Sequence, residues 1–122
     1  MLRVILLLLA AFPCVALADT YLCVPEAGAL VADGPKGISA SLADVATHKF
    51  VMTNERGAWV VKELGKDFAI FDHCESVYFC ENSKGFAGAF WRQDDGIFGV
   101  VWTLKDGNVN NLVSAKGKCS KL

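Results

Sequence analysis

The chain has few of the residue patterns on which enzymes depend. Its 122 residues include two histidines, His48 and His73, and no C-x-x-C, no G-x-S-x-G and no glycine-rich phosphate loop between a strand and a helix. These absences argue against a structural zinc site, a hydrolase nucleophile elbow and a nucleotide-binding loop. We therefore predict no catalytic residues, no metal site and no cofactor.

The densest group of reactive side chains is the run Asp72-His73-Cys74-Glu75. In an extended chain its members alternate between two faces, so they do not converge on one point. We interpret the run as a loop beside a disulfide. The acidic pair Asp94-Asp95 precedes Gly96, and Asp is favoured in turns for its local hydrogen bonding alone.

Neither sign of charge dominates the sequence. Twelve Lys and Arg stand against thirteen Asp and Glu, and without Arg3 the balance is eleven to thirteen, a net charge of about −2. This near balance argues against a nucleic-acid partner. Lys116, Lys118 and Lys121 gather near the C-terminus, where we expect a solvated end.

A long hydrophobic run occurs only at the start. Arg3 is followed by fifteen uncharged residues, 4–18, which include Pro13 and end on Ala16-Leu17-Ala18. This is the pattern of a secretory signal peptide with an A-x-A cleavage site, and it is shorter than the roughly twenty residues that span a bilayer. We expect residues 1–18 to be removed, leaving one domain, 19–122, periplasmic or secreted and without a membrane span.

Cysteine usage fits export. Cys14 leaves with the signal peptide, and four cysteines remain: Cys23, Cys74, Cys80 and Cys119. An even number in a short exported chain indicates disulfides. Spacing alone leaves three connectivities open. Because the ends of a compact domain often lie close together, we favour Cys23–Cys119. The remaining pair, Cys74–Cys80, is close enough for a sharply turned hairpin.

Short β-rich runs separated by turn residues predict an all-β domain. The clearest strand, 97–104, is apolar on both faces and should be central and buried. Asp95-Gly96 before it and Asp106-Gly107 after it are strong hairpin signals. The other expected strands are 20–24, 49–53, 57–64, 67–71, 76–80, 86–92 and 109–115. Sequential hairpins make an antiparallel meander, which at this size curls into a small barrel.

One segment, 38–47, allows two interpretations. Ser41 and Asp44 have the spacing of a helix cap before apolar residues, which indicates a helical turn. Ile38–Leu42 is equally compatible with an edge strand. Both remain open from the sequence.

Aromatic residues give the one functional lead. Five of them, Phe86, Phe90, Trp91, Phe98 and Trp102, fall within one predicted hairpin. Phe90 and Trp91 must point to opposite faces, so one of them is expected to face outward. Aromatic and Arg side chains are enriched at binding surfaces. Our candidate binding residues are Trp91 and Arg92, with Asp94 and Asp95 shaping the turn.

The two chain ends also carry a resemblance. The start Tyr21-Leu22-Cys23-Val24-Pro25, the middle Trp59-Val60-Val61-Lys62 and the end Gly117-Lys118-Cys119-Ser120 resemble small exported bacterial proteins of uncharacterised function. The resemblance implies export and end-to-end cysteine pairing. A fainter likeness is to the periplasmic inhibitors of C-type lysozyme, which are small disulfide-closed β-barrels. Their inhibitory loop has no match here, so its residues are not carried over.

These observations favour an exported noncatalytic binding module, such as an inhibitor or an envelope-associated factor. Its partner would be a protein or an envelope polymer. The alternatives are a small envelope hydrolase and a purely structural envelope protein.

Overall fold

Ten strands and no helix make up the residues that the structure describes. The computed structural model describes residues 19–84, 88–106 and 109–122, with the backbone alone for 104–106 and 109–110. The strands are β1 (Thr20–Gly34), β2 (Gly37–Ala43), β3 (Phe50–Glu55), β4 (Ala58–Glu63), β5 (Ala69–Phe71), β6 (His73–Ser76), β7 (Phe79–Glu81), β8 (Gly88–Arg92), β9 (Ile97–Asp106) and β10 (Val109–Lys121).

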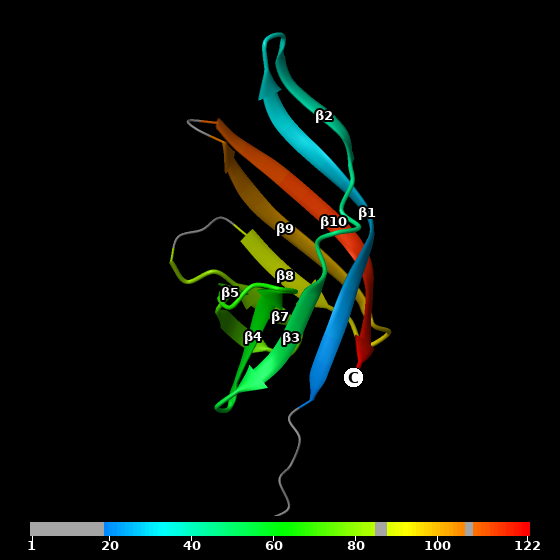
Figure 1. Ribbon diagram of the computed structural model, residues 1–122, viewed down its shortest axis with the longest axis vertical. Coiled ribbons are helices and arrows are strands. Elements are labelled where there is room, and N and C mark those ends of the chain that lie inside the picture. The colour runs from blue at the N-terminus through cyan, green and yellow to red at the C-terminus, as the bar shows by residue number, and fades with distance from the viewer. Residues whose placement is uncertain (1–18, 85–87, 107–108) are drawn as a thin grey trace, which may run out of the picture.

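All strand pairs are antiparallel, in the order β5-β4-β3-β1-β10-β9-β8-β7-β6, with β2 paired to β1 alone. The sheet curls until β4 contacts β6 and β7, so it is nearly closed into a barrel (Figure 1). The predicted all-β, barrel-like fold is thus confirmed. It departs from a simple meander at β1, which lies between β3 and the last strand, β10.

Both favoured disulfides are present. Cys23 and Cys119 face each other directly across β1 and β10, and Cys74 and Cys80 do so across β6 and β7. The first joins residues 96 positions apart and the second residues 6 apart. The four cysteines of 19–122 therefore leave no free thiol, and the two chain ends are fixed side by side.

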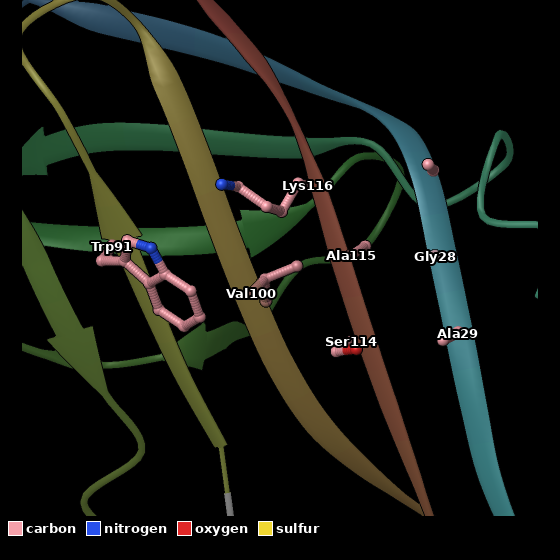
Figure 2. Close-up of a pocket in the computed structure, with 8 residues that line it drawn as sticks. Gly28, Ala29, Trp91, Val100, Ser114, Ala115 and Lys116 are labelled. Carbon is pink, nitrogen blue, oxygen red and sulfur yellow. The ribbon is translucent and has the colours of Figure 1, made fainter. Parts of the chain in front are cut away.

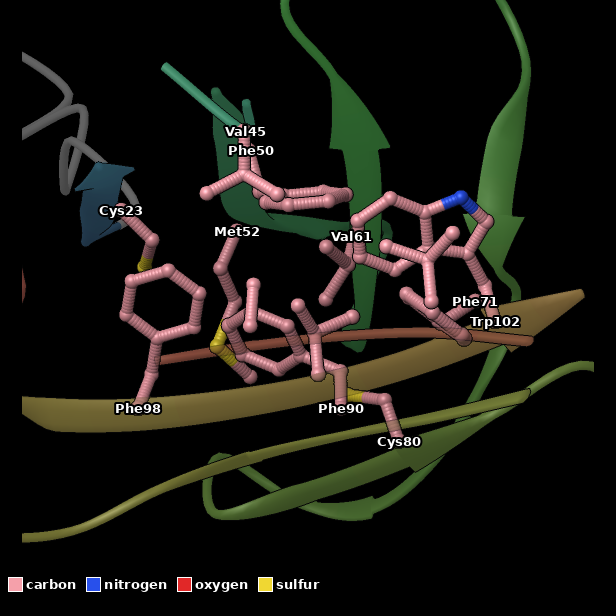
Figure 3. Close-up of a cluster of buried hydrophobic side chains, with 13 residues drawn as sticks. Cys23, Val45, Phe50, Met52, Val61, Phe71, Cys80, Phe90, Phe98 and Trp102 are labelled. Carbon is pink, nitrogen blue, oxygen red and sulfur yellow. The ribbon is translucent and has the colours of Figure 1, made fainter. Parts of the chain in front are cut away.

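Aromatic rings fill the barrel (Figure 3). Phe50, Phe71, Phe90 and Phe98 are at most 1% exposed, and the stacked rings of Phe90 and Phe98 lie 5.4 Å apart between centroids. Phe98, Val100 and Trp102 occupy alternate positions on β9, as expected for its core-facing side. The predicted central strand is confirmed, because β9 lies between β8 and β10 and is bonded to both.

The first and last strands are longer than predicted. β1 continues past the expected end at Val24 through Pro25 and an Ala- and Gly-rich segment, a composition that is poor in strand formers. Pro25 is accommodated at a bulge, where the register against β10 shifts between Pro25 and Ala27. β10 continues past Ala115, so the C-terminal lysines that we expected on a loose end lie on a strand.

Two further expectations change, and the alternatives left open for one segment are resolved. The expected strand 76–80 contains the turn between β6 and β7, because residues 77 and 78 form that turn. The run 72–75, expected as a loop, largely forms strand β6. Segment 38–47 is strand β2 up to Ala43 and has no helix. Phe86 and the predicted turn at Gly107 lie outside the described residues.

The β1–β2 hairpin extends beyond the barrel. We call residues 28–43 of this hairpin the arm, which lies at the top of Figure 1; β1 still pairs with β10 as far as Val31, and beyond that residue only β1 and β2 continue. Six of the seven residues of β2 are exposed. One face of the sheet therefore continues from the barrel wall onto the arm.

Candidate functional site

The outer face of the sheet carries a shallow groove with Trp91 at one side (Figure 2). Its volume is about 440 Å³, and it crosses β8, β9, β10 and β1. The lining residues are Ala27, Gly28, Ala29, Trp91, Val100, Ser114, Ala115 and Lys116.

Strand register explains why Trp91 lies there. Trp91 pairs with Gly99, Gly99 with Lys116, and Lys116 with Ala27, so one row crosses four strands. Gly99 has no side chain, and a Cβ at that position would lie 2.2 Å from Cζ2 of Trp91. The indole ring can therefore lie against the backbone of β9 instead of standing away from the sheet.

The next row keeps the groove open. Ala89 pairs with Val101, Val101 with Ser114, and Ser114 with Ala29. Paired residues point to the same face of the sheet, so this row places mainly small side chains beside the indole ring. The result is a flat strip that an extended ligand can lie along.

Lys116 is the one charged residue in the described lining of the groove. It is exposed, and its side chain crosses β9 toward the strand that carries Trp91 (Figure 2). The groove thus offers an aromatic surface, a hydroxyl group from Ser114 and an ammonium group. From the sequence, Lys116 was expected in a solvated end, because its pairing with Gly99 depends on strand register.

Arg92 lies on the opposite face from Trp91. It is 9% exposed, with its guanidinium carbon 4.1 Å from the ring centroid of Tyr21 and 5.2 Å from that of Tyr78. A cation over two aromatic faces is stabilised by their quadrupoles. The structure therefore does not bring Arg92 together with Trp91, and the Arg92 guanidinium contacts Tyr21 and Tyr78 instead.

The two turn acids have different contacts. Asp95 Oδ1 accepts a hydrogen bond from the backbone N–H of Ile97 at 3.0 Å, and Gly96 takes a positive φ of 86°. Asp95 thus stabilises the predicted turn. A hydrogen bond to Asp94, with the nearby charge of that carboxylate, raises the pKa of Tyr78. Neither acid lines the Trp91 groove.

A second cavity, of about 680 Å³, opens at the barrel rim near the start of β3 and the ends of β4 and β5. His48 Nδ1 lies 2.7 Å from Glu63 Oε1, and the His48 ring is 5.7 Å from the ring of Trp102. Two hydrogen bonds from Ser83, from its hydroxyl and its N–H, lower the pKa of Asp72 nearby. The lining is His48, Glu63, Phe68, Ala69, Ile70, Asp72, Asn82, Lys84, Trp102 and Thr103.

The His48–Glu63 pair was missed from sequence because the two residues are 15 positions apart and meet only through the β3–β4 register, in which Phe50 pairs with Glu63. A hydrogen-bonded His and carboxylate can transfer a proton. The described lining of this cavity has no Ser or Cys for a nucleophile of the kind that a His usually activates. Over the described part of the chain, no three His, Cys, Asp or Glu side chains are grouped as metal ligands.

Comparisons with protein-family models, with curated proteins and with solved structures find no match. In residues 19–84, 88–106 and 109–122, there is no helix of the length and apolarity that crossing a membrane requires.

Proposed function

We propose that this chain is an exported noncatalytic binding module that holds an extended segment of an envelope polymer against the outer face of the sheet. The observation that carries the proposal is the position of Trp91, whose ring lies against Gly99 beside Lys116. An exposed side of an aromatic ring next to a cation and a hydroxyl is a typical binding contact.

The shape of the groove supports an extended ligand. It is shallow, and four of its eight lining residues are Ala or Gly. Compact small molecules are usually held in deep cavities that bury most of their surface. A chain lying across the strands instead needs a flat surface with an aromatic anchor, which this face provides without any rearrangement of the sheet.

Export is part of the proposal and is supported by two independent features. Residues 1–18 have the composition of a signal peptide. The two disulfides are compatible with an oxidising compartment, where such bonds persist. An envelope polymer is a ligand available in that compartment.

A small envelope hydrolase is the alternative, and the His48–Glu63 pair is the observation that would support it. The two functions use different surfaces. The groove is on the outer face, whereas His48 and Glu63 lie at the barrel rim. Variants can therefore separate them.

The test uses NMR signals of the three indole N–H groups, from Trp59, Trp91 and Trp102, during titration with soluble fragments of an envelope glycan. We expect the Trp91 signal to shift most. Trp91→Ala should weaken binding about 30-fold or more, as for an aromatic hot spot. Gly99→Ala should also weaken it, because the added Cβ displaces the ring while leaving it in the protein.

Matched controls lie away from the groove. Phe68→Ala removes an aromatic side chain that is 64% exposed at the rim cavity and is the control for Trp91→Ala. Lys116→Ala should weaken binding, because it removes the ammonium group of the groove, and Lys66→Ala, at another exposed lysine, is its control. Both controls should bind normally. If the unsubstituted protein cleaves the glycan and Glu63→Gln does not, the hydrolase is favoured instead. Binding that is unchanged in a folded Trp91→Ala variant would reject the groove.

A further inference from the structure

Strand β2 presents an open sheet edge. It pairs with β1 on one side, and on the other side no described strand pairs with it. Ile38 and Leu42 are 76% and 94% exposed. Proteins usually protect such edges with charged residues, proline or a bulge, yet the sequence Gly-Ile-Ser-Ala-Ser-Leu-Ala of β2 has no charge and no proline, and its register with β1 has no shift.

The direction of the free backbone groups follows from the hairpin. β1 and β2 are joined by a two-residue turn, Pro35-Lys36, which is closed by the pair Gly34–Gly37. The closing pair of such a hairpin is hydrogen-bonded, and bonded pairs alternate along an antiparallel ladder. The N–H and C=O groups of Ile38, Ala40 and Leu42 therefore point away from β1.

The sequence of β2 is nearly symmetric about Ala40. Ser39 and Ser41 flank it, and Ile38 and Leu42 lie two positions away on either side. We propose that β2 pairs antiparallel with β2 of a second copy of this chain, around a two-fold axis at Ala40. Ala40 then lies opposite the partner's Ala40, and Ile38 lies opposite the partner's Leu42.

This register matches both the hydrogen bonds and the side chains. The three residues whose backbone groups point outward become the bonded pairs. Ile38, Ala40 and Leu42 share one face of the strand, so each Ile38 contacts the partner's Leu42. Ser39 lies opposite the partner's Ser41 on the other face, where the two hydroxyls can hydrogen-bond. A symmetric interface of this kind closes at two copies.

Charge complementarity supports the same register. Continuing it beyond the strand places Lys36, in the hairpin turn, opposite the partner's Asp44, and the two-fold axis repeats this pair at the other end. Any shift of register separates these charges and moves Ile38 away from the partner's Leu42. The described part of β2 thus specifies one pairing, with a second copy as its occupant.

The proposal does not depend on the Trp91 groove, but it has a consequence for it. Ala40 pairs with Val31 and Val31 with Leu112, while Leu42 pairs with Ala29, so the outer face of β2 continues the face that carries the groove. A dimer through β2 would place two grooves on one continuous sheet. Two linked sites bind a polymer more tightly than one.

The test begins with sedimentation of the exported protein over a range of concentrations, and we expect a dimer that dissociates on dilution. Ala40→Pro should raise its dissociation constant about tenfold or more, because it removes an N–H that points outward and leaves the ladder to β1 intact. A protein that stays monomeric up to millimolar concentration, or a dimer unaffected by Ala40→Pro, would overturn the proposal.

Cysteine cross-linking checks the register. Ala40→Cys should form an intermolecular disulfide, because bonded antiparallel pairs have Cα atoms about 5.5 Å apart. Ser39→Cys, the matched control, should cross-link only when mixed with Ser41→Cys. Equal cross-linking of Ser39→Cys with itself would contradict a two-fold axis at Ala40.

Charge reversal gives an independent readout. Lys36→Glu should weaken the dimer about two- to fivefold, the scale of exposed ion pairs, and Lys36→Glu with Asp44→Lys should restore it. Failure of the second substitution to restore the dimer would contradict the proposed register. Near-UV circular dichroism confirms that each variant keeps its barrel.

Discussion

Phe90 in the barrel and Leu42 in the arm are both large apolar side chains on β-strands, yet Phe90 is fully buried and Leu42 is 94% exposed. In the barrel, the curled sheet surrounds the side chains of its inner face, so rings from opposite walls meet. In the arm, β2 is paired with β1 alone among the described strands, and six of its seven residues are exposed. A large apolar side chain therefore stabilises the fold in the barrel, whereas in the arm it remains available for contacts with other molecules.

Covalent closure adds to this difference. Both disulfides lie in the barrel, where one joins the chain ends, whereas the arm is held by the β1–β2 ladder and by the pairing of β1 with β10. The barrel is therefore covalently restrained, whereas the arm depends on hydrogen bonds between strands.

The largest effect is expected from the disulfides. Replacing Cys23 and Cys119 together by Ser should lower the free energy of unfolding by about 4–5 kcal/mol, because this bond closes a loop of nearly the whole domain. The same change at Cys74 and Cys80 should cost about 2–3 kcal/mol, as expected for a short loop. Urea unfolding of both double variants measures the difference, and the reverse order would show that loop length does not control it.

Truncation of single apolar residues should separate the two regions by a somewhat smaller amount. Phe90→Ala should lower the free energy of unfolding by about 3–5 kcal/mol, because it leaves a cavity among the packed rings. Leu42→Ala should change it by less than about 0.5 kcal/mol, as for exposed positions. The measurement is made at a concentration where the protein is monomeric, and a loss above about 2 kcal/mol at Leu42 would show that the arm packs against the barrel.

The smallest effect concerns pH. Hydrogen bonds from Ser83 lower the pKa of Asp72, so the folded state holds the ionised carboxylate more strongly than the unfolded state does. The resulting contribution to stability is present above the pKa of Asp in the unfolded state, about 3.9. It is lost as the pH falls through the lower pKa of the folded state. Asp72→Asn should therefore show a weaker decline of stability below about pH 4 than the unsubstituted protein.

Ser83→Ala is the control for that effect, since it removes the hydrogen bond that lowers the pKa of Asp72 most and keeps the carboxylate. It should weaken the decline in part. Strand β2 contains no titratable side chain, so β2 itself should contribute nothing in the same pH range. An unchanged acid profile in Asp72→Asn would assign the acid sensitivity to other groups.

Several elements were predictable because they depend on neighbouring residues. Gly96 follows Asp95 and takes the positive φ that this hairpin requires, and β9 has the uninterrupted apolar sequence of a strand bonded on both sides. The disulfide pattern followed from the closeness of the chain ends. The length of β1 was not predictable from local preference, because its Ala, Gly and Pro residues form a strand only when β2 and β10 supply the hydrogen bonds.

The candidate sites were predictable only in part, for the same reason. The aromatic pair at 90 and 91 had to divide between two faces, and the sequence alone therefore indicated that one ring faces outward. That this ring is Trp91, and that Gly99 and Lys116 lie beside it, depends on the register of β8, β9 and β10. Arg92 was expected at the surface as an Arg next to an outward aromatic, but its stacking on Tyr21 and Tyr78 depends on residues distant in the chain.

The sequence by itself therefore determined the all-β class and the positions of most turns, since these follow from backbone preference and apolar alternation, and it favoured the cysteine pairing that the structure shows. The tertiary structure decided which strand edges are open and which side chains lie next to each other across strands. Those relations depend on register, and a shift of one residue would exchange the two faces of a strand. The Trp91 groove and the free edge of β2 both arise at this level.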